Sequence, residues 1–110
     1  MSISAIGSGL SGMQSFQRAL DVSANNVANL DTNGFKPQQA EFQANTGDGV
    51  NVRVSGTTAP QDAAAANAPS GTDLTSETVN SLQYKAGFEL SAQVVKTADQ
   101  MLGTLIDTKA

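Results

Sequence analysis

Apolar residues recur along the first third of the chain at alternating steps of three and four. The row consists of Ile3, Ile6, Leu10, Met13, Leu20, Ala24 and Val27, and only Gln17 interrupts it. Such a heptad pattern is typical of a helix that packs one apolar face against partner helices. We therefore predict a helix from Ser4 to Asn29, roughly 40 Å long at about 1.5 Å per residue.

Three glycines fall in the first turns of this predicted helix. Gly7, Gly9 and Gly12 each cost a helix about 1 kcal/mol relative to alanine. Two explanations remain open and compatible. The glycines allow close approach of another helix, or they leave the segment to become ordered only on assembly.

The helix is followed by a turn and then by an extended segment. Side-chain amides near the helix end can satisfy carbonyl groups that lose their intrahelical partners. Asn33-Gly34 tolerates positive φ, and Pro37 forces Lys36 out of the α region. The residues assigned to this turn motif are Asn25, Asn26, Asn29, Thr32, Gly34, Phe35 and Lys36.

The middle of the chain contains a predicted β-hairpin and a linker. Residues 41–44 and 50–54 flank Asn45-Thr46-Gly47-Asp48-Gly49, and valines alternate with polar residues in the second segment. An isolated hairpin is marginal in water, so Phe42 and the valines should cover a helix or a neighbouring subunit. Residues 55–71 are rich in Ala, Gly, Thr, Pro and Asn, which indicates a linker.

A second, longer helix is predicted from about Asp73 to Asp107. Asp73 can cap it, and Glu77 lies in the first turn, where the helix dipole favours negative charge. Its apolar residues widen into more than one contact surface. The residues assigned to helix packing and assembly are Ile6, Leu10, Met13, Leu20 and Val27 in the first helix and Leu82, Leu90, Val94, Met101 and Leu105 in the second.

These elements predict an all-α fold in which two long terminal helices pack as an antiparallel, coiled-coil hairpin. The parts are the N-terminal helix and turn motif (1–36), the β-hairpin and flexible linker (37–72), and the C-terminal helix (73–110). We expect the apolar edges of the two helices to shield each other and neighbouring subunits from water.

Composition argues against catalysis and against nucleic-acid binding. The chain has no His and no Cys, so we expect no catalytic residues, no metal site, no cofactor and no small-molecule substrate. Asp73 with Glu77, and Glu89 with Gln93, have i, i+4 spacing, but solvated or capping roles suit them better than a catalytic dyad. Six scattered Lys and Arg residues and a net charge of -4 give no phosphate-binding face.

The motifs at both ends resemble those of bacterial flagellar rod and hook proteins. Residues 8–13, 20–22, 25–29 and 32–36 are similar to the family's N-terminal signature, and residues 73–82 and 95–105 to its closing helix. The resemblance implies a non-enzymatic structural subunit of the flagellar basal-body rod, in the periplasm. It also implies export through the flagellar type III apparatus without signal cleavage, and assembly with copies of itself and other rod or hook subunits through coiled-coil packing.

The chain departs from the family pattern in two places. Hook and distal rod proteins carry large β domains between their helices, whereas about 35 residues stand there in this chain, as in a short, proximal-rod-like member. Residues 84–92 also differ from the family's usual Gln-Arg-Ala-Tyr-Gln-Ala-Asn-like stretch.

The alternative to a rod subunit is a soluble coiled-coil adaptor or secreted effector that oligomerises outside the flagellum.

Overall fold

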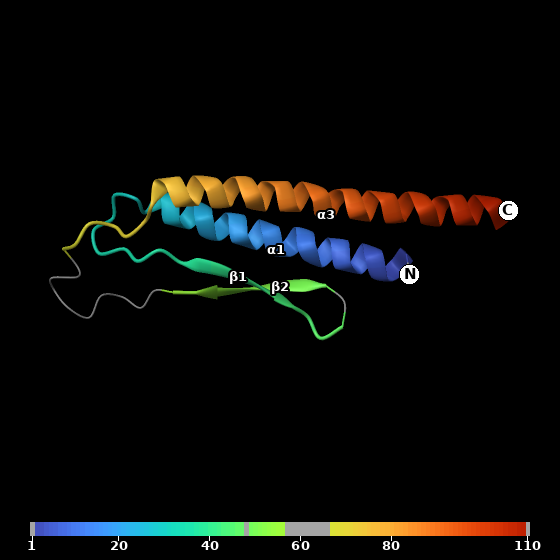
Figure 1. Ribbon diagram of the computed structural model, residues 1–110, viewed down its shortest axis with the longest axis horizontal. Coiled ribbons are helices and arrows are strands. Elements are labelled where there is room, and N and C mark those ends of the chain that lie inside the picture. The colour runs from blue at the N-terminus through green and yellow to red at the C-terminus, as the bar shows by residue number, and fades with distance from the viewer. Residues whose placement is uncertain (1, 48, 57–66, 110) are drawn as a thin grey trace.

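The computed structural model of the protein describes residues 2–47, 49–56 and 67–109, and gives the backbone alone for 2, 3 and 105–109. The elements are α1 (Ser2–Ala28), β1 (Gln39–Ala44), β2 (Val50–Ser55) and α3 (Leu74–Lys109). The molecule is elongated, with extents of 70 × 26 × 14 Å. Figure 1 shows α1 and α3 side by side and antiparallel, with the hairpin along α1.

The two helices form the predicted hairpin, and α3 is the longer by nine residues, at 36 against 27. Its C-terminal end therefore extends past the start of α1 (Figure 1). Among the residues that the structure describes, neither helix is long and apolar enough to cross a membrane.

Small residues make the contact between the helices. A Cβ atom added at Gly9 would lie 2.6 Å from Val95 Cγ2, and one at Gly12 would lie 2.6 Å from Ser91 Oγ. A Cβ atom at Gly87 would overlap the ring of Phe16. Close helix approach therefore explains Gly9 and Gly12, whereas a Cβ atom at Gly7 would have no neighbour within 4 Å.

The large apolar residues that we assigned to helix packing do not fill this contact. Leu10 is 50 % exposed, Leu82 65 % and Leu90 63 %, and Val27, Val94 and Met101 of the same set are exposed as well. Our expectation that the two apolar edges shield each other is therefore wrong for these residues within one chain. The buried face of α1 instead includes Ser15, Ala19, Val22, Ser23 and Asn26. Its small side chains let the helices approach more closely than rows of leucine would.

The hairpin is present as predicted and packs on its own chain. β1 and β2 are antiparallel, with Ala44 opposite Val50 and Phe42 opposite Val52. Ser15 Oγ donates to the carbonyl of Val50 at 3.1 Å, and the Val50 N–H donates to Ser11 Oγ at 3.1 Å. The fold is thus mostly helical with a two-stranded sheet, so the term all-α describes it only roughly.

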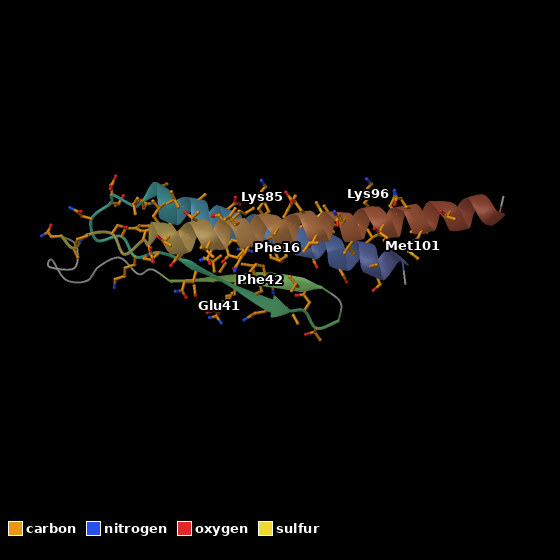
Figure 2. The ribbon with its side chains drawn as sticks, turned by 45° about the horizontal axis from the view of Figure 1, so that its top comes forward. Phe16, Glu41, Phe42, Lys85, Lys96 and Met101 are labelled. Carbon is orange, nitrogen blue, oxygen red and sulfur yellow. The ribbon has the colours of Figure 1, made fainter. Side chains whose placement is uncertain are left out.

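Aromatic rings link the hairpin to both helices. The ring centroid of Phe42 lies 4.9 Å from that of Phe16 on α1 and 5.8 Å from that of Tyr84 on α3. Figure 2 shows Phe16 and Phe42 facing each other between helix and strand. Val52 is also buried, so the predicted apolar side of the strands covers the helix.

The turn after α1 joins the segment that leads into α3. Gly34 has the predicted positive φ, at 76°. Its N–H donates to the Ala68 carbonyl at 2.6 Å, and the Gly71 N–H donates to the Phe35 carbonyl at 2.9 Å. These backbone bonds hold the two chain segments together where the helix pair begins. Most of the predicted linker, residues 57–66, lies outside the described residues.

Candidate assembly surface

Asp73 caps α3, as the sequence predicted. The Thr75 N–H donates to Asp73 Oδ1 at 3.1 Å, and Ser76 Oγ donates to Asp73 Oδ2 at 2.9 Å. The hydroxyl of Ser76, followed by the N–H of Thr75, holds the pKa of Asp73 below its ordinary value of 3.8. Both bonds favour the ionised carboxylate, which also suits the positive end of the helix dipole.

Asn26 connects α1 to both neighbouring segments. Its Oδ1 atom accepts from the Gln38 N–H, and its Nδ2 atom donates to the Gln38 carbonyl, each at 2.8 Å. Nδ2 also donates to Glu77 Oε1 at 2.8 Å, and Thr72 Oγ1 donates to the Asn26 carbonyl at 3.0 Å. The amide of Asn26 therefore pairs with the backbone N–H and carbonyl of Gln38, as the backbone of a neighbouring strand would. This side chain is 1 % exposed and connects the residue before β1 to both helices.

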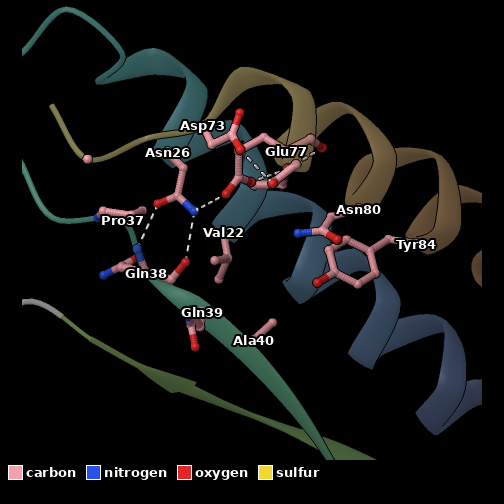
Figure 3. A pocket seen from close by; sticks show the side chains of 13 residues that line it. Val22, Asn26, Pro37, Gln38, Gln39, Ala40, Asp73, Glu77, Asn80 and Tyr84 are labelled. Atoms are coloured by element: carbon pink, nitrogen blue, oxygen red, sulfur yellow. Dashed lines mark hydrogen bonds between the residues drawn. The ribbon is translucent and has the colours of Figure 1, made fainter.

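Glu77 accepts from the opposite helix. Ser23 Oγ lies 2.7 Å from Glu77 Oε2 and 2.8 Å from Ser81 Oγ. Glu77 is only 8 % exposed, so our expectation of a solvated role is wrong for this residue, whereas its predicted place in the first turn of α3 is confirmed. Figure 3 shows its hydrogen bonds with those of Asn26. We refer to Ser23, Asn26, Gln38, Thr72 and Glu77 as the polar cluster.

A polar cavity of about 340 Å³ adjoins the polar cluster, with Tyr84 at one side (Figure 3). Burial, and secondarily the negative charge of Glu77, raises the pKa of Tyr84 above its ordinary value of 10.0. Every buried polar side-chain atom among the described residues has a hydrogen-bond partner. In the same part of the chain, no three His, Cys, Asp or Glu side chains come together as a metal site.

The polar cluster determines which helix faces remain outside. A fully satisfied buried network favours this relative position of the two helices, because a shift along the axis would leave the Glu77 carboxylate without its partners. With the helices in this position, the large apolar side chains line two shallow grooves, each of about 390 Å³. Leu20, Val27, Leu74 and Leu82 line the first, and Leu90, Val94 and Met101 line the second.

The predicted site residues separate into three groups. Leu10, Val27, Leu82, Leu90, Val94 and Met101 are exposed, Ile6, Met13 and Leu20 are half-buried, and the side chain of Leu105 lies outside the described residues. Their role in assembly stays a prediction. In the turn motif, Asn29 Nδ2 donates to the Asn25 carbonyl at 2.9 Å, but that carbonyl also accepts from the Asn29 N–H at 3.2 Å, so it has not lost its backbone partner. Asn26 binds other segments instead.

The prediction missed Ser23, Gln38, Thr72 and the partner role of Glu77. The spacing of Ser23 and Asn26 could have indicated a second contact face, because the two polar residues lie three positions apart on the first helix, away from its apolar row. Polar residues at such spacing form a second face of the helix, and this face is the buried one.

The fold is that of an elongated helical hairpin that leaves rows of large apolar residues uncovered, which is typical of a subunit of a larger assembly. The profile described as "Flagella basal body rod protein" matches residues 6–36, and "Flagellar basal body rod FlgEFG protein C-terminal" matches residues 68–108. The chain belongs to the flagellar rod and hook protein family. The two matched segments contain most of α1, from residue 6 onward, nearly all of α3, and both Asn26 and Glu77.

Similar proteins carry hook or rod names. The flagellar hook protein FlgE of Borreliella burgdorferi is 32% identical over 84 residues, which is 74% of this chain and 18% of that protein. FlgE of Helicobacter mustelae is 60% identical over 35 residues, 32% of this chain and 8% of that protein. The basal-body rod protein FlgG of Bacillus subtilis is 53% identical over 36 residues, 33% of this chain and 14% of that protein. The matched part is less than a fifth of each relative.

Proposed function

We propose that this protein is a non-enzymatic structural subunit of the flagellar axis, and that it belongs to the basal-body rod. Its terminal helices assemble with copies of the chain and with other rod or hook subunits. The flagellar type III apparatus exports it to the periplasmic rod without signal cleavage. One observation carries the proposal: small and polar residues form the contact between α1 and α3, whereas large apolar residues on the other helix faces remain exposed.

The short middle of the chain supports the rod rather than the hook. Only residues 37–67 lie between the two matched segments, and their described part is a two-stranded hairpin packed on α1. There is no room in that interval for the large β domain that the resemblance associates with hook and distal rod proteins. The subunit would therefore contribute mainly helix to the axis.

Replacing Leu90 by Asp tests assembly. Leu90 is 63 % exposed, so the variant should fold as the parent does, while a charge in a buried contact between subunits should prevent incorporation. In a strain that carries only the variant, we expect loss of swimming and absence of the protein from purified basal bodies. Gln100→Asp, an exposed change on the same helix, is the matched control and should retain both.

Immunogold labelling of purified hook–basal bodies tests the position of the wild-type chain. Label on the rod supports the proposal, whereas label on the hook corrects it to a hook subunit. A chain that remains in the cytoplasm of cells with a working export apparatus would support the adaptor instead. Motility unaffected by Leu90→Asp would remove the exposed row from the mechanism.

A further inference from the structure

The charged residues of α3 beyond Glu77 form one exposed stripe. Between positions 78 and 104 the helix carries four charged residues, all exposed, and their signs alternate along the chain: Lys85, Glu89, Lys96 and Asp99. Steps of four, seven and three keep them on one side of a helix over roughly 21 Å. Figure 2 shows Lys85 and Lys96 on the same side of α3, turned away from the hairpin.

The charges of this stripe are complementary to those of a second copy that runs in the opposite direction. An antiparallel copy of α3 places Lys85 opposite Asp99 and Glu89 opposite Lys96, and the midpoints of the two pairings, at Ala92 and between Ala92 and Gln93, differ by only half a residue. Two-fold symmetry repeats each pair, so all the charges meet opposite charges. A parallel copy in register would instead place like charges together. The stripe therefore favours an antiparallel partner of the same sequence.

An exposed apolar row on α1 lies at the same level. The contacts of Gly9 with Val95 and of Gly12 with Ser91 place Leu10 beside positions 93 and 94 of α3, about one residue from the midpoint of the charged stripe. Leu10 is 50 % exposed, with Ile6 and Met13 half-buried on either side of it. A two-fold axis near this level sets Leu10 close to Leu10 of the second copy and Ile6 close to its Met13.

The apolar row and the charged stripe lie on one side of the helix pair. Leu10 and Met13 line a groove with Phe88 of α3, and Lys85 lines a groove with Leu20 and Val27 of α1. The apolar row of α1 and the charged stripe of α3 can thus be related to a second copy by one two-fold axis. A self-complementary patch of this kind is the requirement for an isologous contact.

We propose that this face, formed by Ile6, Leu10 and Met13 with the stripe from Lys85 to Asp99, joins two copies of the chain as an antiparallel four-helix dimer. The apolar row forms the centre of the contact, and the charge pairs fix its direction and register. The inference does not rest on the flagellar proposal, since it follows from the surface alone. A two-fold dimer closes on itself, so it would cover Leu10 in the free protein.

Charge exchange with sedimentation equilibrium tests the register. Lys85→Glu disrupts two symmetry-related pairs and should weaken the dimer by at least roughly tenfold. Lys85→Glu with Asp99→Lys restores both intermolecular pairs and should return the dissociation constant to within roughly threefold of the parent. This rescue cannot come from within one helix, because the double variant brings like charges together at positions 85 and 89 and at 96 and 99.

A second double variant is the matched control. Lys85→Glu with Glu89→Lys keeps opposite charges four residues apart within the helix but places like charges across the proposed dimer. It should be at least as weak as the single variant, because both kinds of pair then bring like charges together. Circular dichroism checks that each variant stays folded, as exposed positions lead us to expect. Recovery by this control to the parent's affinity would overturn the proposed register, and a parent that stays monomeric at millimolar concentration would overturn the dimer.

Disulfide trapping provides an independent measurement. The chain has no cysteine, so a single introduced thiol can form a disulfide only between molecules. Ala92→Cys lies at the proposed two-fold axis and should oxidise to a covalent dimer, and Lys85→Glu should suppress that product. Gln83→Cys, exposed and away from the face, should remain monomeric. Equal trapping at positions 83 and 92 would contradict the proposal.

Discussion

Removal of the Asn26 side chain should lower the free energy of unfolding by more than the loss of one hydrogen bond would. Asn26→Ala breaks three hydrogen bonds of 2.8 Å, two to Gln38 and one to the carboxylate of Glu77. Each neutral bond contributes about 1 kcal/mol and a bond to a charged group about 1.5 to 3 kcal/mol. Their sum is roughly 4 kcal/mol, and water entering from the adjoining cavity of about 340 Å³ would reduce it to roughly 2 to 3 kcal/mol.

Urea unfolding followed by circular dichroism measures this loss. With an m-value of about 1 to 3 kcal/mol per M, the midpoint should fall by roughly 0.7 to 3 M. Asn26→Asp should be at least as damaging near neutral pH, because its second carboxylate oxygen would face Glu77 Oε1 and the Gln38 carbonyl. Asn25→Ala, at an exposed neighbouring position, should change stability by less than about 0.5 kcal/mol. If Asn26→Ala costs no more than this control, the polar cluster does not hold the helices together.

Two further predictions concern the helix contact and the cavity. Gly87→Ala pushes a methyl group into the Phe16 ring and should lower the free energy of unfolding by about 1 kcal/mol. The cost of overpacking, roughly 2 kcal/mol, exceeds the gain in helix propensity, about 1 kcal/mol. A Cβ atom at Gly103 would have no neighbour within 4 Å, so Gly103→Ala should instead raise the melting temperature. Melting temperatures that move in the same direction would refute the close contact. Spectrophotometric titration of the single tyrosine should place the pKa of Tyr84 above 10.0 in the folded protein, and Glu77→Gln should lower it. Because the raised pKa favours the protonated phenol, stability should decrease as pH rises above about 10, and equal pKa values in folded and urea-unfolded protein would contradict the burial of Tyr84.

Local chemistry made much of the fold predictable. The heptad row and the Asp73 cap indicated the two helices to within a few residues, because periodicity and capping act over one or two turns. The hairpin followed from alternating valines around a glycine-containing turn, and Gly34 has the positive φ that the turn needs. The family resemblance, carried by the same segments, was confirmed by the matches over residues 6–36 and 68–108.

Which helix face is buried was decided only by the tertiary structure. The apolar row of α1 marked Leu10 and Val27 as contact residues, but a heptad pattern does not state which partner covers it. Within one chain, the contact that also satisfies Asn26, Glu77 and the start of β1 uses the small and polar face. Sequence alone therefore determined the helices, the turn and the hairpin, since each depends on neighbouring residues. The burial of Glu77 and the exposure of the apolar rows depend on groups about 50 residues apart, whose hydrogen bonds exist only when both helices and the strand come together.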